Sequence, residues 1–182
     1  MKELSLNILD IAKNSTKAQA TKIEITLAEN TASGFLTIII KDNGCGMSGD
    51  FLEKVIDPFT TTRTTRKVGL GLPLFKLAAE QAGGSMEIVS KEGVGTTVTA
   101  TFEIENIDRM PVGDLAGTFV TLVQGDPEVR FVLTCRVDGD EFVADTDEIK
   151  EILEGMPITS PQVLVWLGGF ISENMSEIGF KN

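Results

Sequence analysis

The chain has 182 residues, 42% hydrophobic and 24% charged, a composition typical of a globular protein with one sizeable core. Its formal net charge of −11 argues against nucleic acid as the main partner, because duplex binding needs a basic face. No apolar stretch reaches the roughly 18 residues that a membrane helix requires. The absence of histidine excludes histidine general acid–base chemistry, histidine metal ligation and phosphohistidine formation on this chain.

The two cysteines, Cys45 and Cys135, share no metal-ligand spacing, and the N-terminus has no signal-like pattern. We therefore expect a reducing, cytoplasmic environment with no membrane association. Both thiols are expected to be free, and a disulfide is not.

Residues 3–18 carry apolar side chains mainly on one helical face, which predicts a first helix. Asp10, Asn14 and Lys17 are spaced i, i+4 and i+7, so this helix presents them as one polar stripe beside the apolar face. By itself, such a stripe is more typical of plain surface than of a binding site.

Residues 22–27 alternate polar with apolar side chains, and residues 35–40 are apolar apart from Thr37, which predicts a hairpin with one buried strand. The second strand ends at Asp42, which supplies a hydrogen-bond acceptor. Gly44 and Gly46 follow, and their lack of a Cβ lets the backbone approach a flat ligand. This loop suits the amino group of a purine, although an ordinary hairpin turn has a similar composition.

A short helix is predicted over residues 49–55, followed by a polar run at residues 60–67 with five threonines and three cations. We interpret this run as a mobile loop rich in phosphate-binding groups. Gly69 and Gly71 then precede a helix that begins near Pro73. The exposed N–H groups and the dipole of a helix N-terminus favour anion binding, although glycine-rich loops alone are weak signals.

The apolar face predicted for this helix consists of Leu74, Leu77, Ala78 and Ala82. The helix is expected to end at residues 83–84, which are both glycine. Residues 85–89 and 96–102 then predict a second hairpin, which turns at residues 93–95.

Over residues 3–103 these ordered motifs resemble the GHKL ATPases, the superfamily of histidine kinases, gyrase, Hsp90-type chaperones and mismatch-repair ATPases. Residues 42–46 match the adenine box, and residues 69–72 and 93–97 match the later glycine boxes. The resemblance implies an α+β fold, a two-layer α/β sandwich of the Bergerat type, with helices covering a mixed, mostly antiparallel sheet. It also implies an ATP-binding domain at residues 1–104 and a small α+β extension at residues 105–182.

The cofactors that the resemblance implies are ATP and Mg²⁺. Asn14 would supply a magnesium ligand, since Mg²⁺ needs few protein oxygens when phosphates supply the rest. Asp42 would accept a hydrogen bond from the adenine amino group, and Thr97 would supply a further hydroxyl on the adenine side or hold a water there. The complete nucleotide-binding set is Asn14, Lys17, Asp42, Gly44, Gly46, Phe59, Thr60, Arg63, Arg66, Lys67, Gly69, Leu70, Gly71, Leu72 and Thr97.

Asp10 stands one turn before Asn14, where hydrolytic and serine-kinase members of the superfamily carry a glutamate base. A hydroxyl or water nucleophile must lose a proton, whereas an imidazole nitrogen need not. A carboxylate here therefore favours transfer to water or to a hydroxyl. Aspartate is one methylene shorter than glutamate, however, and the alternative is that Asp10 only orients a magnesium-bound water.

Residues 104–182 match no family motif. Their patterns predict a helix around residues 115–123, a hairpin at residues 129–144, a short acidic helix at residues 147–153 and a closing helix at residues 161–174. Residues 109–113 are the expected joint. This extension is interpreted as a docking unit, a dimerisation unit or a continuation of the core.

Three functions follow from the resemblance. One is an enzyme that moves the ATP γ-phosphoryl to a partner protein or to water, and the second is a non-catalytic, ATP-dependent switch that binds a partner. The third, a histidine kinase core, needs a segment carrying a phosphoacceptor histidine, and the chain has no histidine. A homodimer is compatible with all three.

Overall fold

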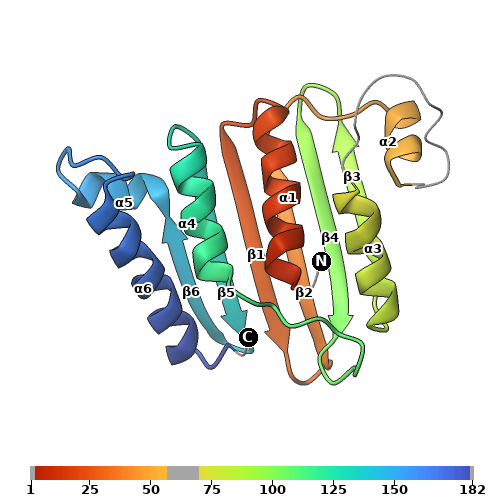
Figure 1. Cartoon of the computed structure of the whole chain (residues 1–182). Helices are drawn as coiled ribbons and strands as arrows, with labels where there is room; N and C mark the ends of the chain where they lie inside the picture. The colour runs from red at the N-terminus through yellow and green to blue at the C-terminus, as the bar shows by residue number, and fades with distance from the viewer. Residues whose placement is uncertain (1–2, 57–69, 181–182) are drawn as a thin grey trace.

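The chain forms one mixed sheet with helices packed on one of its faces (Figure 1). The computed structural model describes residues 3–56 and 70–180. The strands are β1 (Lys22–Asn30), β2 (Phe35–Asp42), β3 (Met86–Lys91), β4 (Gly95–Glu103), β5 (Arg130–Val137) and β6 (Asp140–Asp145). The helices are α1 (Leu4–Lys17), α2 (Gly49–Ile56), α3 (Gly71–Gln81), α4 (Leu115–Gly125), α5 (Thr146–Ile152) and α6 (Pro161–Glu177).

The six strands follow the order β3-β4-β2-β1-β5-β6. Every neighbouring pair is antiparallel except β1 and β5, which run parallel. In Figure 1, α1, α3, α4 and α6 lie on the same face of the sheet. The predicted class, an α+β two-layer sandwich with a mixed and mostly antiparallel sheet, is confirmed.

The core lies between this helical layer and the sheet. Alternate residues of the two central strands, such as Ile25 and Ile38, point at the helices and are fully buried. Leu4 and Ile8 of α1 meet them from the other side. Burying a side chain of this size contributes about 1.5 to 3 kcal/mol, so α1 and the central strands fix one another.

The predicted buried face of α3 is partly wrong. Ala78 and Ala82 are buried, but Leu74 and Leu77 are 38% and 48% exposed, and Phe75 is fully buried instead. The Phe75 ring packs against Phe102 of β4, with ring centroids 5.6 Å apart. The Phe75 ring therefore takes the core position of this helix, and the helix is rotated by about one residue from the expected face.

Residues 105–180 continue the same sheet and the same core. β5 pairs along nearly the whole length of β1, and α4 packs between α1 and α6. Phe131 of β5 and Phe119 of α4 meet edge to face with centroids 6.2 Å apart. Among the three expected roles of the extension, continuation of the core is therefore observed, whereas docking and dimerisation stay predictions. The domain boundary at residue 104 also stays a prediction.

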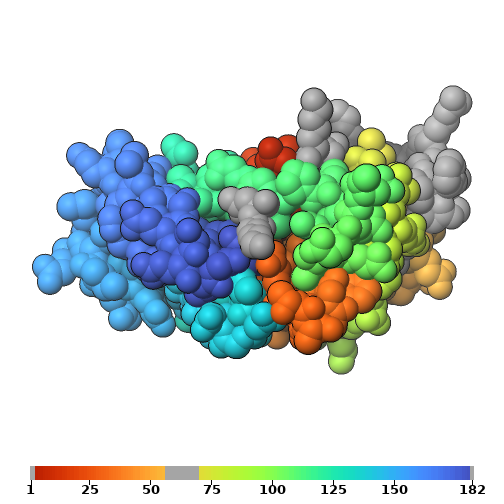
Figure 2. Space-filling model, turned by 90° about the horizontal axis from the view of Figure 1, so that it is seen from below, coloured from red at the N-terminus to blue at the C-terminus, as the bar shows by residue number. Residues whose placement is uncertain are grey.

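The predicted joint at residues 109–113 caps the N-terminus of α1. The N–H groups of Leu4 and Ser5 donate to the carbonyl oxygens of Pro111 and Val112 at 3.0 and 2.8 Å. Val112 is fully buried. Figure 2 views the molecule from below, and the green atoms of this part of the chain lie across the face turned to the viewer. Because the first N–H groups of a helix lack partners within the helix, the extension provides hydrogen bonds that α1 cannot make itself.

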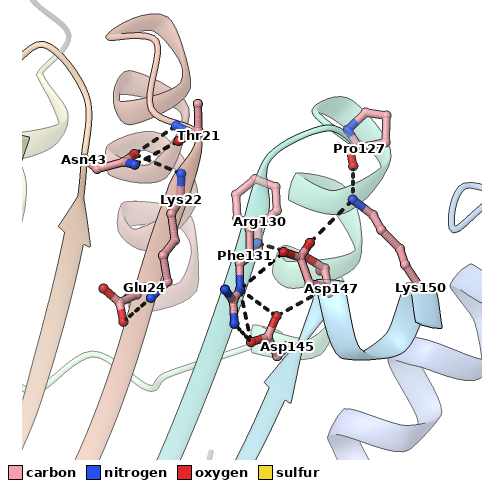
Figure 3. A network of polar contacts seen from close by, with 11 residues as sticks. Thr21, Lys22, Glu24, Asn43, Pro127, Arg130, Phe131, Asp145, Asp147 and Lys150 are labelled. Atoms are coloured by element: carbon pink, nitrogen blue, oxygen red, sulfur yellow. Dashed lines mark hydrogen bonds and ion pairs between the residues drawn. The ribbon is translucent and has the colours of Figure 1, made fainter. Parts of the chain in front are cut away.

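A polar network joins the start of β5 to the end of β6 (Figure 3). The Arg130 guanidinium donates to both carboxylate oxygens of Asp145 and also lies 3.5 Å from Asp147. Asp145 accepts from the Asp147 N–H as the N-cap of α5. Burial raises the pKa of Asp145, but the hydrogen bonds from Arg130 and Asp147 outweigh it, so the pKa lies below its ordinary value.

The two thiols lie in different environments. Cys45 is exposed and Cys135 is buried, and both are free. Burial and the nearby Glu29 carboxylate raise the pKa of Cys135 to about 12, so this thiol stays protonated and unreactive at neutral pH.

Within residues 3–56 and 70–180, no helix combines the length and the hydropathy needed to span a bilayer.

Candidate nucleotide-binding site

A cavity of about 380 Å³ lies between α1, α2, the start of α3 and the loop that follows β2. Its volume falls in the range of small-molecule sites. Polar groups enter from α1 and from the ends of β2 and β4, whereas α2 and α3 contribute apolar walls. The lining residues are Ile11, Asn14, Ser15, Ala18, Ile40, Asp42, Cys45, Gly46, Met47, Ser48, Phe51, Val55, Leu72, Thr96 and Val98.

Asp42 is the most completely positioned polar group in this cavity. Its Oδ1 accepts from the N–H groups of Gly44 and Thr96 at 2.9 and 3.2 Å. Its Oδ2 accepts from the Ser15 hydroxyl at 2.6 Å. A carboxylate offers about four acceptor positions, so one position on Oδ2 is left for a ligand donor. This geometry suits the amino group predicted to bind here.

Ser15 was not predicted from the sequence as a residue of the site. It follows Asn14 on α1 and turns towards the sheet, where it is buried. A small hydroxyl on the buried face of a helix is not by itself a functional signal. Its place in the cavity lining and its hydrogen bond to Asp42, 27 residues away, identify it as part of the site.

The glycine loop after β2 is fixed on both sides. The Cys45 N–H donates to the Ala18 carbonyl at 2.9 Å, and the Cys45 carbonyl accepts from the Gly93 N–H at 2.8 Å. Gly46 has φ +67°, and a Cβ there would lie 2.0 Å from the Lys91 carbonyl oxygen. Only glycine fits this position, because both the backbone conformation and the neighbouring strand exclude a side chain.

Asn43 lies within the predicted motif but has a structural role. Its side-chain oxygen accepts from the N–H groups of Thr21 and Lys22, both at 2.9 Å, and its amide donates to the Thr21 hydroxyl (Figure 3). Asn43 therefore ties the end of β2 to the start of β1 and leaves ligand contacts to its neighbours.

The three residues of the polar stripe on α1 lie in three different environments. The Asn14 side chain lines the cavity and forms no hydrogen bond to another described residue, so its amide oxygen is available to a Mg²⁺ ion. Lys17 is exposed and is not part of the lining. Asp10 lies beside the start of α3 and is not part of the lining either. The donor set around Asn14 fits an ion held mainly by phosphates and water.

The start of α3 meets Asp10. A Cβ on Gly71 would lie 1.8 Å from Asp10 Oδ2, so the carboxylate occupies the space that a side chain would need. Leu70, the N-cap, is exposed, and no described side chain caps the helix. The first N–H groups of α3 and the helix dipole therefore favour an anion close to Asp10.

Not every predicted site residue reaches the cavity. Thr97 faces the other side of the sheet, beside Lys41 and Val89, while Thr96 lines the cavity. Neighbouring strand residues point to opposite faces, so the predicted hydroxyl belongs one position earlier. Phe59, Thr60, Arg63, Arg66, Lys67 and Gly69 lie outside the described residues.

Residues 1–106 match the family described as "Histidine kinase-, DNA gyrase B-, and HSP90-like ATPase". This match covers more than half of the 182 residues. The chain belongs to this family. Its resemblance to the GHKL superfamily, predicted from motifs at residues 3–103, is confirmed. The matched segment contains every cavity-lining residue, so the cavity lies in the part of this GHKL protein that the family shares.

Among curated relatives, "Sensor protein SrrB" of Staphylococcus aureus (strain NCTC 8325 / PS 47) is 38% identical over 102 residues, covering 53% of this chain and 17% of that protein. The "Putative sensor histidine kinase NtrY-like" of Rickettsia conorii is 26% identical over 107 residues, covering 58% of this chain and 17% of that protein. This GHKL domain protein therefore spans about a sixth of the length of these relatives.

A structural comparison relates the chain to "Aquifex aeolicus MutL ATPase domain complexed with ADP". The TM-score is 0.52 at 18% identity, and the match covers 85% of this chain and 70% of that chain. The likeness supports the fold. Because it covers more than the family segment, part of the extension follows the architecture of that neighbour as well.

Proposed function

We propose that the cavity binds ATP with Mg²⁺. The adenine amino group donates to Asp42 Oδ2, the purine lies along the Gly46 loop, and Asn14 provides one oxygen to the metal. Mg²⁺ supplies charge neutralisation for the phosphates when it is bound. The uncapped N-terminus of α3 receives phosphate oxygens. Family membership and the remaining acceptor position on Asp42 support this assignment.

The bound ATP transfers its γ-phosphoryl group to a hydroxyl of a partner protein or to water. The observation that carries this proposal is the position of Asp10, whose carboxylate lies against Gly71 at the helix end proposed to hold the phosphates. There it takes the proton from the attacking hydroxyl or water. A proton acceptor at this place agrees with an oxygen nucleophile on the partner.

The test compares Asp10→Asn with Asp108→Asn, a control that makes the same change at an exposed site outside the cavity. We expect Asp10→Asn to keep ATP–Mg²⁺ affinity within a few-fold and to lower turnover by about 100-fold or more, as in the loss of a general base. Asp108→Asn should change neither quantity. Calorimetry measures the affinity, and phosphate release with and without a candidate partner measures the turnover.

A second function, an ATP-dependent switch without chemistry, is favoured by one observation. Asp42 and Asn14 line the cavity, whereas Asp10 does not. In that case nucleotide occupancy alone changes the affinity for a partner, and Asp10→Asn leaves both turnover and nucleotide-dependent partner binding unchanged. Turnover of the Asp10→Asn variant equal to that of the parent would therefore replace the transferase proposal with the switch.

A further inference from the structure

The negative charge of the protein is concentrated in the extension. Residues 1–104 contain 11 Lys and Arg against 12 Asp and Glu, whereas residues 105–182 contain 5 against 15. The extension therefore carries −10 of the net charge of −11. A local field of this strength attracts cationic partners and repels anionic ones.

An open groove of about 620 Å³ lies on the outer side of the extension, between α4 and α6. The two helices lie side by side in Figure 1, and a Cβ on Gly168 would lie 3.7 Å from the Val120 side chain. Leu164 and Val165 of α6 and Gly117 of α4 also line the groove. Val165 is 78% exposed, so an apolar strip faces solvent here.

The groove has acidic ends and no positive charge on its helices. Neither α4 nor α6 contains a lysine or an arginine. Asp114, at the start of α4, is part of the lining, and Asp126 lies at the other end of the helix. Glu173 and Glu177 belong to the last part of α6, which lies beside the start of α4. An apolar strip therefore runs from a group of three carboxylates at one end towards the single carboxylate of Asp126 at the other.

We propose that this groove docks a cationic amphipathic helix of a partner protein. The apolar face of that helix fills the strip around Val165, and its lysines or arginines meet the carboxylates at both ends. α4 has 11 residues, so about three turns of a partner helix fit along it. No residue lines both this groove and the nucleotide cavity, so the docking site is separate from the nucleotide site.

The charge distribution argues against two other occupants. An anionic membrane surface would be repelled by the carboxylates of the extension. A second copy of the chain would bring another extension of charge −10 against the first. Both occupants are nevertheless distinguished by the experiment.

The test uses the full chain and three labelled synthetic peptides of about 18 residues. The first is a leucine–lysine helix with leucines on one face, the second replaces each lysine by glutamate, and the third has the composition of the first in a scrambled order. Fluorescence anisotropy should detect binding of the first peptide only. Its affinity should fall as ionic strength rises from about 0.05 M to about 0.5 M.

Two variants with the same charge change localise the site. Val165→Lys places a cation in the groove, whereas Ile152→Lys does so on α5 at a residue that is 75% exposed and outside the groove. We expect Val165→Lys to lower the affinity for the leucine–lysine peptide by about tenfold or more and Ile152→Lys to change this affinity by less than about twofold. Both positions are exposed, so both variants should keep the circular dichroism spectrum of the parent.

Several outcomes would overturn the proposal. Equal binding of the glutamate or scrambled peptide would show that complementarity is not the cause, and an unchanged affinity of Val165→Lys would place the peptide elsewhere. Self-association in sedimentation that Val165→Lys abolishes would assign the groove to a second copy. Binding to anionic vesicles that Val165→Lys strengthens would assign it to a membrane.

Discussion

The two parts of the molecule contribute differently to one sheet. Residues 3–104 hold every residue that lines the nucleotide cavity and are nearly neutral, whereas residues 105–180 line no part of it and carry most of the negative charge. Yet α1, which presents Asn14 to the cavity, receives its first hydrogen bonds from Pro111 and Val112. The family motifs thus lie in one part, and the helix that carries Asn14 takes its first backbone hydrogen bonds from the other.

Deletion of residues 107–182 should have the largest effect. It removes the parallel partner of β1, the acceptors at the start of α1 and the helix α4 that covers one side of α1. We expect the remaining chain to lose cooperative unfolding in urea and to bind a dye for exposed apolar surface, because several fully buried side chains become exposed. Cooperative unfolding of residues 1–106 with parental ATP affinity would show instead that the two parts are independent.

Changes at the adenine position should affect binding and leave the extension intact. Asp42→Asn offers a donor where the amino group needs an acceptor, so ATP affinity should fall by about 1 to 3 kcal/mol in calorimetry. Asp108→Asn is the matched control. An unchanged affinity of Asp42→Asn would remove the adenine assignment.

Ser15→Ala tests the positioning of the same carboxylate. It removes the hydroxyl that donates to Asp42 Oδ2 at 2.6 Å, and ATP affinity should fall by a smaller amount, about 0.5 to 1.5 kcal/mol. Thr97→Val is a matched control, because that hydroxyl faces the other side of the sheet. Equal losses of ATP affinity for Ser15→Ala and Thr97→Val would contradict the finding that the Thr97 side chain of β4 faces away from the cavity.

The smallest expected effects concern stability in the extension. Asp145→Ala removes the N-cap of α5 and the ion pair with Arg130, and the free energy of unfolding at pH 7 should fall by about 1 kcal/mol for the cap. The ion pair adds less than about 1 kcal/mol, because Arg130 is 41% exposed. Asp145→Asn retains a capping oxygen, so its free energy of unfolding should lose only the smaller contribution, that of the ion pair. ATP affinity should not change in either variant.

The pH dependence of stability tests the same pair. The folded pKa of Asp145 lies below its ordinary value of 3.8, so its contribution is fully present above pH 3.8 and is lost as pH falls through the folded pKa. Urea unfolding should therefore show a smaller difference between the parent and Asp145→Asn at pH 3 than at pH 7. A difference that is constant with pH would mean that the pair is not linked to folding.

The sequence determined the parts of the fold that depend on local periodicity and on residues with restricted conformations. Every predicted helix and strand is present among the described residues, with shifts at the ends. The turn after Asp42 was predictable because glycine permits the positive φ that Gly46 adopts, and residues of this loop line the cavity. At these positions the backbone conformation depends on the residue itself and on its neighbours in the chain, so the local sequence was sufficient to predict it.

Only the tertiary structure decided which side of an element meets which partner. Phe75 rather than Leu74 faces the core, and Thr96 rather than Thr97 faces the cavity, because packing selects one face of a helix or strand. The bond from Ser15 to Asp42 joins residues far apart in sequence, and β5 adds to β1 across about 100 residues of chain. Such contacts depend on surfaces that exist only once the chain has folded, so the pairing of the extension with β1 and α1 was not readable from the sequence.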